Sequence, residues 1–340
     1  MRSEFLEQIM KMKDKAEQLA KQIKKAKRVA IFLHRNPDED SIGNALAIRL
    51  WLEKEGKRVQ VFSFEKTDGQ FNKLKAFGKI TVTSPQKFNK LEAKKFSHFI
   101  YPDVASLSMI NDEFIYPSTG YNVRLDHHPG ESWADLEIVD TTASSTAEVT
   151  VEIFNELKIE WDKNIASLLM LALIGDTLNF QTPSTTERTF KTAGFLLSQG
   201  ADLVWANRLY YSKLSAGELK NYATLLKNME VDEKRELVWF GLDKSYMAQD
   251  EPGYRGRLID FLTNNVRMLS RPERYVVVSY FEPGGYRVNF RSSKKEVDVR
   301  KWALEFGGGG HVNASGAMVK ADNIKQAMKM VLDAFDRIYG

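Results

Sequence analysis

The chain has 340 residues, of which 43% are apolar and 28% charged, and it has no cysteine. This length exceeds one ordinary core and predicts two domains, while the missing cysteines exclude disulfides and thiolate metal sites and agree with a reducing cytoplasm. The net charge is +4, and residues 235–340 hold all of the excess, with 17 Lys/Arg against 13 Asp/Glu. That excess suits a small anionic ligand, or equally a solvated basic face, better than a long nucleic-acid track.

The sequence also argues against a membrane protein. The longest apolar stretch, residues 165–175, is far shorter than the roughly 20 residues that a membrane span requires. The first 28 residues lack the apolar core of a signal peptide. We therefore expect a cytoplasmic protein with no membrane partner.

The first half of the chain alternates expected helices and strands. Apolar residues at helical spacing predict an amphipathic helix over residues 3–27. Strand, loop, helix and strand then follow one another in an order typical of a doubly wound, mainly parallel α/β sheet. The expected strands are 28–33, 57–64, 98–101 and 122–125, and the expected helices are 42–54 (opened by Ser41), 143–157 and 163–174.

A different pattern begins near Arg235. Helical periodicity runs from residue 185 to about 229, with a break near Gly200, and then gives way to strands and a closing helix. This pattern predicts a smaller α+β domain with a mixed sheet, joined to the first domain by a helical linker. The expected elements are strands 237–242, 275–281 and 286–291, a turn at 283–285 and a helix at 324–338. The predicted parts are an N-terminal helix at 1–27, an α/β domain at 28–195, a linker at 196–232 and an α+β domain at 233–340.

Histidines and aspartates follow several of the expected strand and helix ends. Ligands of open α/β sheets bind outside the carboxyl ends of the strands, so these side chains should converge on one edge of the sheet. His98 begins a strand outside this pattern, and we interpret it as structural. The converging set is His34, Asp38, Asp40, Asp103, Asp126, His127, His128 and Asp176.

The composition of this set predicts metal binding. Imidazoles and carboxylates without thiolates suit manganese, magnesium or iron, and zinc less exclusively. Five carboxylates and three imidazoles exceed the needs of one ion, whereas two ions about 3.5–4 Å apart with a bridging carboxylate would use them. Without cations the carboxylates would repel one another. Taken singly, Asp38 and Asp40 also fit turn and cap positions, and Asp103 and Asp176 fit loop caps.

A second candidate site lies in the basic C-terminal part. Four consecutive glycines, Gly307–Gly310, precede His311, and such a run exposes backbone N–H groups to an anion or forms a flexible turn. Arg291, followed by Ser292, comes at the end of an expected strand. An arginine there grips a phosphate or carboxylate through two parallel hydrogen bonds, or simply faces solvent.

Six blocks of the sequence together resemble the DHH phosphoesterases that carry a DHH-associated C-terminal domain. Within that family the chain is most similar to the nanoRNase and pAp phosphatase group, which is related to RecJ exonuclease and to cyclic-di-AMP phosphodiesterases. The resemblance covers nearly the whole chain after the N-terminal helix. The blocks are His34–Gly43, Asp103, Asp126-His127-His128, Gly175-Asp176-Thr177, Val288–Ser292 with Asp298-Val299, and Gly307–His311.

The resemblance implies a role for each matching residue. His34, Asp38 and Asp103 would hold one manganese ion, with magnesium as the alternative metal. Asp40, Asp103, His127 and Asp176 would hold a second, with Asp103 between the two ions. Asp126 would orient an imidazole, and His128 would face the scissile phosphate. The expected substrate-binding residues are Arg291, Ser292, Gly308, Gly309, Gly310 and His311.

The implied activity is hydrolysis of a phosphoester in short single-stranded oligonucleotides or in pAp-type nucleotides. The alternatives are a cyclic-di-AMP or pApA phosphodiesterase, an inorganic pyrophosphatase, and an impaired nucleotide- or RNA-binding protein. Two residues depart from the family pattern: Glu39 replaces the usual glycine of the first motif, and Asn44 stands where serine is common. The sequence leaves open whether the chain is a monomer or a homodimer.

Overall fold

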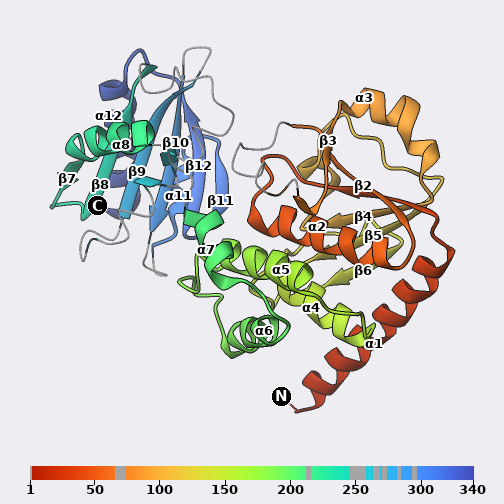
Figure 1. Cartoon of the computed structure of the whole chain (residues 1–340). Helices are drawn as coiled ribbons and strands as arrows, with labels where there is room; N and C mark the ends of the chain where they lie inside the picture. Colours follow the sequence, from red (N-terminus) through yellow and green to blue (C-terminus); the bar gives the residue numbers. More distant parts are fainter. Residues whose placement is uncertain are drawn as a thin grey trace. The chain divides into compact units, whose positions relative to one another are not determined.

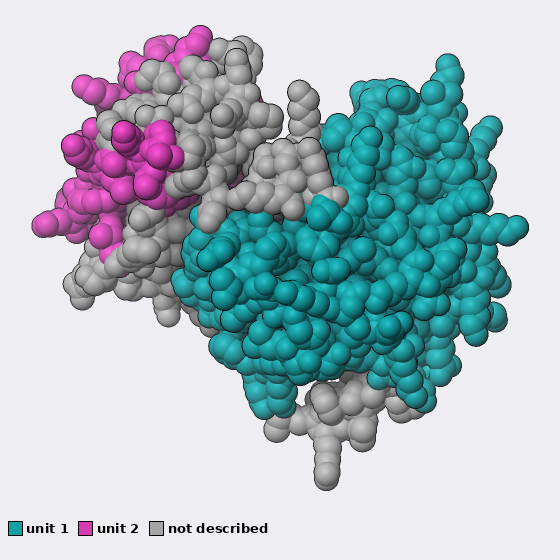
Figure 2. Space-filling model, viewed as in Figure 1, with its two compact units in different colours: residues 1–213 teal, residues 214–340 magenta. Residues whose placement is uncertain are grey.

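The structure, a computed structural model, describes residues 2–65, 74, 76–211, 216–244, 258–259, 261–262, 269, 274–281, 285–292 and 297–340. The side chains of residues 2–11, 218, 221, 224 and 311 lie outside this description, as does most of the predicted turn at 283–285. The chain forms two compact units, residues 1–213 and 214–340, coloured separately in Figure 2. Among the described residues, no helix combines the length and the apolar composition of a membrane span.

The first unit is built on a parallel six-stranded sheet with the order β3-β2-β1-β4-β5-β6. Every pair of neighbouring strands is parallel, which confirms the predicted doubly wound α/β class. Two short strands, β3 and β6, were not predicted, and both lie at edges of the sheet. The strands are β1 (Arg28–Phe32), β2 (Arg58–Ser63), β3 (Ile80–Val82), β4 (His98–Pro102), β5 (Tyr121–Asp126) and β6 (Leu136–Val139).

Helices surround this sheet close to the predicted positions. The expected helix start at Ser41 is wrong by two residues, because the Asp38 carboxylate accepts a hydrogen bond from the Ser41 backbone N–H and so caps the helix earlier. The helices are α1 (Arg2–Lys25), α2 (Glu39–Lys54), α3 (Pro85–Lys87), α4 (Thr146–Glu156), α5 (Lys163–Asp176), α6 (Glu187–Ser198) and α7 (Leu203–Tyr211). Short π and 3-10 turns lie at Phe88–Glu92, Ala93–Lys95 and Leu107–Met109.

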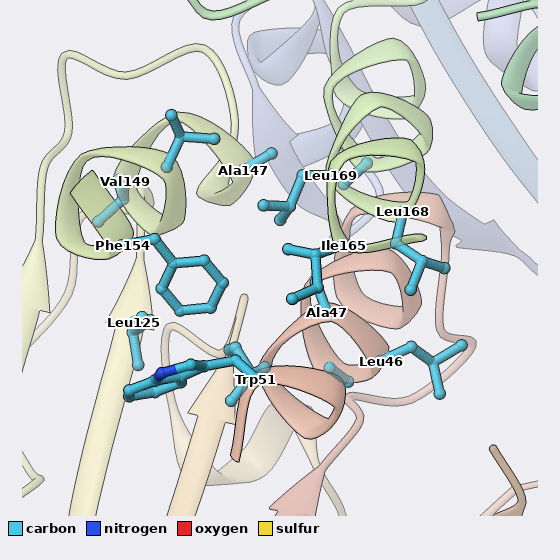
Figure 3. Packing of buried hydrophobic residues seen from close by; sticks show 14 of the residues in the cluster. Leu46, Ala47, Trp51, Leu125, Ala147, Val149, Phe154, Ile165, Leu168 and Leu169 are labelled. Carbon is cyan, nitrogen blue, oxygen red and sulfur yellow. The ribbon is translucent and has the colours of Figure 1, made fainter. Parts of the chain in front are cut away.

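The two faces of the parallel sheet have different cores. On one side of the sheet, aliphatic side chains of the strands form one core cluster with residues of α1, α2, α4, α5, α6 and α7, and α2, α4 and α5 lie together there (Figure 1). Figure 3 shows Trp51 of α2 beside Phe154 of α4, with ring centroids 5.0 Å apart. The opposite face carries an aromatic cluster that includes Phe32, Phe62 and Phe99. A sheet buried on both faces is what parallel strands require.

The second unit is built on a mixed sheet with the order β11-β12-β10-β9-β8-β7. Only β8 and β9 pair in parallel among the described strands, so the predicted α+β character is confirmed. One face packs against α11 and α12, and the other against α8. The elements are α8 (Ala216–Lys227), β7 (Glu230–Asp232), β8 (Leu237–Leu242), β9 (Arg274–Phe281), β10 (Gly285–Ser292), α11 (Val299–Leu304), β11 (Gly309–His311), β12 (Ala314–Val319) and α12 (Ile324–Tyr339).

Candidate metal centre and substrate site

The topology explains why the predicted site residues meet. In a sheet with this strand order, the chain leaves β1 and β4 toward opposite sides, and the crevice at their carboxyl ends is the usual ligand site. His34 follows β1, Asp103 follows β4, and the His127-His128 pair follows β5. Asp38 and Asp40 lie at the start of α2, and Asp176 ends α5. The predicted convergence on one edge is therefore confirmed, and His98 lies at the opposite end of β4.

His34, Asp38 and Asp103 form the first possible cation site. Nε2 of His34 lies 3.5 Å from Oδ1 of Asp38 and 3.3 Å from Oδ2 of Asp103. Nδ1 of His34 lies 2.7 Å from the carbonyl of Arg35, which fixes the ring and directs Nε2 to the carboxylates. Burial lowers the pKa of His34, but Asp103 and Asp38 raise it to about 11. A single ligand atom from each residue is close enough to the others to hold one ion.

Asp40, His127 and Asp176 form a second group of the same kind. Nε2 of His127 lies 2.9 Å from Oδ2 of Asp176, yet it is buried and makes no hydrogen bond among the described residues. Nδ1 of the same ring lies 3.3 Å from the carbonyl of Ala143. Such a ring, fixed through Nδ1 and with a buried Nε2 directed at a carboxylate, suits a metal ligand.

Asp103 lies between these two groups. Its Oδ2 approaches His34, while its Oδ1 lies 3.8 Å from Nε2 of His127 and 3.4 Å from Nδ1 of His128. Burial alone would raise the pKa of Asp103, but His128 and His34 hold it well below its usual value. The residue also adopts a left-handed backbone conformation with φ of 60°, a strained geometry that is frequent at functional sites.

The electrostatics of the cluster fit divalent cations. Burial raises the pKa of Asp40 well above its usual value, and the nearby Asp176 and Asp103 add to the rise. Burial likewise raises the pKa of Asp176 to about 6, although His127 opposes the shift. Carboxylates that lie this close cannot all stay ionised without positive charge among them. The donor set, carboxylate and imidazole without sulfur, is one that manganese or magnesium accepts.

Several residues that the sequence analysis did not identify support Asp40. The backbone N–H groups of Thr146 and Ala147, at the N-terminus of α4, donate to its two carboxylate oxygens at 2.8 and 3.3 Å. Asn44 donates to Oδ1 at 2.8 Å and accepts a 2.6 Å hydrogen bond from Thr150. The departure from the family pattern at Asn44 therefore has a structural role. The fixed positive end of α4 stabilises the ionised carboxylate.

Close packing of α2 against α5 sets the spacing of the metal-binding residues. A Cβ atom at Gly43 would lie 2.6 Å from the carbonyl oxygen of Leu168, and one at Gly175 would lie 2.6 Å from Cβ of Glu39. The helices can approach this closely only because both positions lack a side chain. Gly175, next to Asp176, therefore leaves the space that the side chain of Glu39 occupies.

The Asp126-His127-His128 triplet forms a tight hydrogen-bonded turn. Oδ1 of Asp126 accepts from the backbone N–H groups of His127 and His128 at 2.7 and 3.0 Å and lies 2.9 Å from Nδ1 of His128. Asp126 therefore orients the imidazole of His128. The hydrogen bonds to Asp103 and Asp126 raise the pKa of His128 to about 10, so the ring is a hydrogen-bond donor at neutral pH.

The buried Arg124, which the sequence analysis also did not identify, supports this turn through hydrogen bonds. Arg124 of β5 is only 1% exposed, and its Nε and Nη2 atoms donate to Oδ2 of Asp126 at 3.1 and 2.6 Å. Nη2 also donates to the carbonyl of His128, and Nη1 to Glu131 and Glu137. The hydrogen bonds from His128 and Arg124 hold the pKa of Asp126 below its usual value despite burial. Strand periodicity could not single it out, because both faces of a parallel sheet are buried.

The second unit brings the other predicted residues onto neighbouring strands. Arg291 of β10 pairs with Ala314 of β12, which pairs in turn with His311 of β11. Antiparallel pairing places directly opposite residues on the same face of a sheet, so Arg291 and Ala314 share one face. Ser292 is buried, and its backbone N–H donates to the carbonyl of Asn313.

The glycine run is more ordered than predicted. Of the alternatives that the sequence left open, the flexible turn is wrong for Gly309–His311, because these residues form the edge strand β11. The physical reason is a close approach: a Cβ atom at Gly308 would lie 2.2 Å from the carbonyl oxygen of Gly316, and Gly310 has φ of 136°. On β10, Asn289 is buried beside Gly316, and its Nδ2 has no hydrogen-bond partner among the described residues.

Comparisons with known proteins agree with this arrangement. The DHH family N-terminal domain matches residues 28–173, and the DHHA1 domain matches residues 243–337. A relative from Bacillus subtilis, the bifunctional oligoribonuclease and PAP phosphatase NrnA, is 28% identical over 300 residues, which is 85% of this chain and 89% of the relative.

Solved structures share the fold. An exopolyphosphatase-related protein from Bacteroides fragilis superposes with a TM-score of 0.80 at 21% identity, covering 95% of this chain and 96% of that one. RecJ from Thermus thermophilus, solved in complex with Mn²⁺, gives a TM-score of 0.56 at 11% identity, covering 96% of this chain and 55% of that one. Identities this low establish a common architecture only.

Proposed function

Because the chain belongs to the DHH family of phosphoesterases and carries a DHHA1 domain, we propose that it hydrolyses short oligonucleotides and pAp-type nucleotides with two divalent cations, manganese in preference to magnesium. One observation carries the proposal: two groups of possible metal ligands lie side by side, with Asp103 reaching both. The similarity to an oligoribonuclease and PAP phosphatase supports this substrate class.

In the proposed centre, His34, Asp38 and Asp103 hold one cation, and Asp40, Asp103, His127 and Asp176 hold the other. When bound, two such ions polarise a phosphoryl group and lower the pKa of an attacking water. The protein's own contribution is positional. Thr146, Ala147 and Asn44 keep Asp40 in place, and the carbonyl of Ala143 fixes the ring of His127.

His128 is the proposed contact to the scissile phosphate. Its ring is held by Asp126 and carries a proton at neutral pH, so it donates a hydrogen bond to a phosphoryl oxygen as negative charge develops there. Asp126 is a positioning residue, because its oxygens are occupied by Arg124, His128 and backbone N–H groups. In the second unit, we propose that Arg291, Ser292, Gly308, Gly309, Gly310 and His311 bind a terminal phosphate or nucleotide of the substrate.

The proposal includes the domain boundaries predicted above, with catalysis assigned to residues 28–195 and substrate binding to residues 233–340. The purified protein, loaded with manganese or magnesium, would be assayed against triribonucleotides, pAp, pApA, cyclic-di-AMP and pyrophosphate. We expect the first two to be turned over fastest, with higher rates in manganese. Turnover of pyrophosphate alone would assign a pyrophosphatase instead. If no substrate is turned over by protein that holds two ions per chain, the proposed activity is wrong.

A further inference from the structure

The loop that directly follows Asp176, one of the proposed metal ligands, contains an aromatic residue, Phe180. Leu178, Asn179 and Phe180 all adopt left-handed backbone conformations, with φ of 48°, 58° and 66°. Even a single residue other than glycine rarely adopts this left-handed conformation. Strained backbone segments of this kind are frequent at ligand-binding sites. The loop is pinned in place, since the hydroxyl of buried Thr177 donates to the Leu173 carbonyl and accepts from the Phe180 N–H.

The loop stacks its phenylalanine on a ring of the next helix. Phe180 and Phe190 of α6 have ring centroids 5.3 Å apart and planes 21° from parallel. Phe190 remains 59% exposed, so Phe180 leaves much of its surface free. Nδ2 of Asn179 donates a 3.0 Å hydrogen bond to the hydroxyl of Tyr211, whose side chain is also exposed. We call the stacked pair Phe180 and Phe190, together with Tyr211, which is tied to the same loop through Asn179, the aromatic platform.

From this platform we infer a nucleobase-stacking subsite for the proposed substrate, an inference that rests on the proposed function. Phe190 offers a flat π-face that would add a base as a third layer to the existing stack. Bases stack on aromatic side chains with little sequence preference, which suits an enzyme acting on varied short strands. A short strand held at the metal centre would thereby be gripped through a base as well as through its phosphates.

The position of the platform agrees with a short substrate. Phe180 lies four residue steps after Asp176, so their Cα atoms lie at most about 14 Å apart. That span corresponds to about four stacked nucleotides at 3.4 Å each. A phosphate held by the proposed cations beside Asp176 therefore leaves a neighbouring base of the same strand within reach of Phe180.

The surroundings of Phe190 favour a base over a protein partner. On α6 the ring is flanked by the ion pair of Glu187 and Lys191, whose side chains are 81% and 74% exposed. On the loop side, the hydroxyls of Thr182 and Ser184 lie 2.8 Å apart. A single ring with a polar rim resembles a stacking site for one base, whereas protein interfaces require a broader apolar surface.

The test compares Phe190→Ala with Leu197→Ala, a matched truncation of an exposed residue two turns further along α6. In the manganese-loaded full chain, we expect Phe190→Ala to raise KM for a triadenylate about tenfold to a hundredfold with little change in kcat, as the loss of one stacked base predicts. Leu197→Ala should match the wild type, and Phe190→Trp should restore KM. An abasic trinucleotide should bind the wild type and Phe190→Ala equally.

The same proteins would be titrated calorimetrically with a phosphorothioate-linked triadenylate and its abasic counterpart, so the subsite is tested even without turnover. If the wild type turns over no nucleotide yet prefers the base-bearing ligand, the proposed activity fails and the subsite stands. If the wild type is active but Phe190→Ala behaves like Leu197→Ala, the subsite is wrong. Changed oligomeric state in both variants would assign this surface to contact between copies of the chain, which also overturns the inference.

Discussion

The two units of this protein prepare their candidate sites by opposite means. The first unit gathers charge, placing Asp40 and Asp103 almost fully out of water at the carboxyl edge of a parallel sheet. The second unit has glycines where most residues would carry side chains, so its edge strand β11 lies close to β12. The first site depends on balanced charge, so its activity should change with metal, with pH and when a single carboxylate is removed. The second site depends on close packing without side chains, so its stability should change when a methyl group is added.

We expect Asp103→Ala, in the charged centre of the first unit, to have the largest effect on activity. Removing the carboxylate that reaches both ligand groups should lower kcat/KM by about a thousandfold or more, because a two-ion centre contributes several kcal/mol to transition-state stabilisation. Bound manganese, measured by elemental analysis, should fall below two ions per chain. Asp112→Ala is the control, since that aspartate is exposed and forms its ion pair with Arg35 at 2.7 Å. Near-normal rates in Asp103→Ala would refute the assignment of the centre.

A second prediction concerns protons that compete with the metal. Without metal, the pKa of His34 is raised to about 11, so the ring is protonated between pH 6 and 8 and must lose a proton to bind an ion. The pKa of Asp176, raised to about 6, adds a second proton at lower pH. Raised pKa values mean weaker metal binding as pH falls. We expect manganese affinity to drop about tenfold per unit from pH 8 to 6, and more steeply below.

Calorimetry in two buffers of different ionisation enthalpy would measure both the affinity and the released protons. At pH 7 the binding of manganese should release at least one proton per chain. His98→Gln serves as the control, because this buried histidine lies at the opposite end of β4. An affinity that does not change with pH would mean that His34 is not a ligand.

Arg124 tests how far the charged centre depends on its supporting groups. Arg124→Met leaves Asp126 buried without its cation, which should reduce the free energy of unfolding by about 3–5 kcal/mol. Loss of the support for His128 should lower kcat by about ten- to a hundredfold. Arg124→Lys keeps the charge but not the fork of donors, so its effects should be smaller.

Arg300→Met is the matched control, because Arg300 pairs with Asp298 at a half-exposed surface position and such pairs contribute about 0–1 kcal/mol. Chemical denaturation and steady-state kinetics would measure both quantities. If Arg124→Met unfolds at the wild-type midpoint, the buried arginine does not stabilise the triplet in the way described.

These contrasts also show which parts of the site sequence patterns can reveal. His34, Asp103 and Asp176 were predictable because each follows a strand or ends a helix, and the carboxyl edge of a parallel sheet collects such positions. The sequence predicts the strands β1, β2, β4, β5, β8, β9 and β10 from short β-rich runs. It does not predict the short edge strands β3, β6, β7 and β11, because three or four residues carry no clear periodicity and are defined by their partners. It also misses β12 (Ala314–Val319), which follows the glycine run and contains a single β-branched residue.

The supporting groups could not be predicted for a different reason. Thr146 and Thr150 contact residues more than a hundred positions away, and nothing local in the sequence marks such pairs. Arg124 lies between apolar residues in a strand that is buried on both faces. Such a strand shows no regular alternation of polar and apolar residues, so the sequence pattern does not mark a buried arginine as unusual. The glycine run fits a flexible turn as well as an anion-binding segment, because sequence alone does not show that a Cβ atom at Gly308 would lie 2.2 Å from the carbonyl oxygen of Gly316 in β12.

The smallest predicted effect concerns the second unit and uses two adjacent glycines. Gly308→Ala would place Cβ 2.2 Å from the carbonyl oxygen of Gly316 and 2.6 Å from Cβ of Ala317, so the edge strand must shift. Overpacking of this kind should lower the free energy of unfolding by about 1–3 kcal/mol. If the edge strand binds substrate, KM should also rise a few-fold while kcat stays close to the wild-type value.

Gly309→Ala is the internal control, because the added methyl group would meet no atom within 4 Å among the described residues other than its own chain neighbours. Its stability should stay within about 0.5 kcal/mol of the wild type, since surface substitutions without special contacts rarely do more. Equal destabilisation by both substitutions would mean that chain entropy, and not the approach of β12, makes these glycines necessary. A lowered kcat in Gly308→Ala, with unchanged KM, would show that the edge strand acts on the chemical step, and the contrast between a charged centre and a binding edge would then fail.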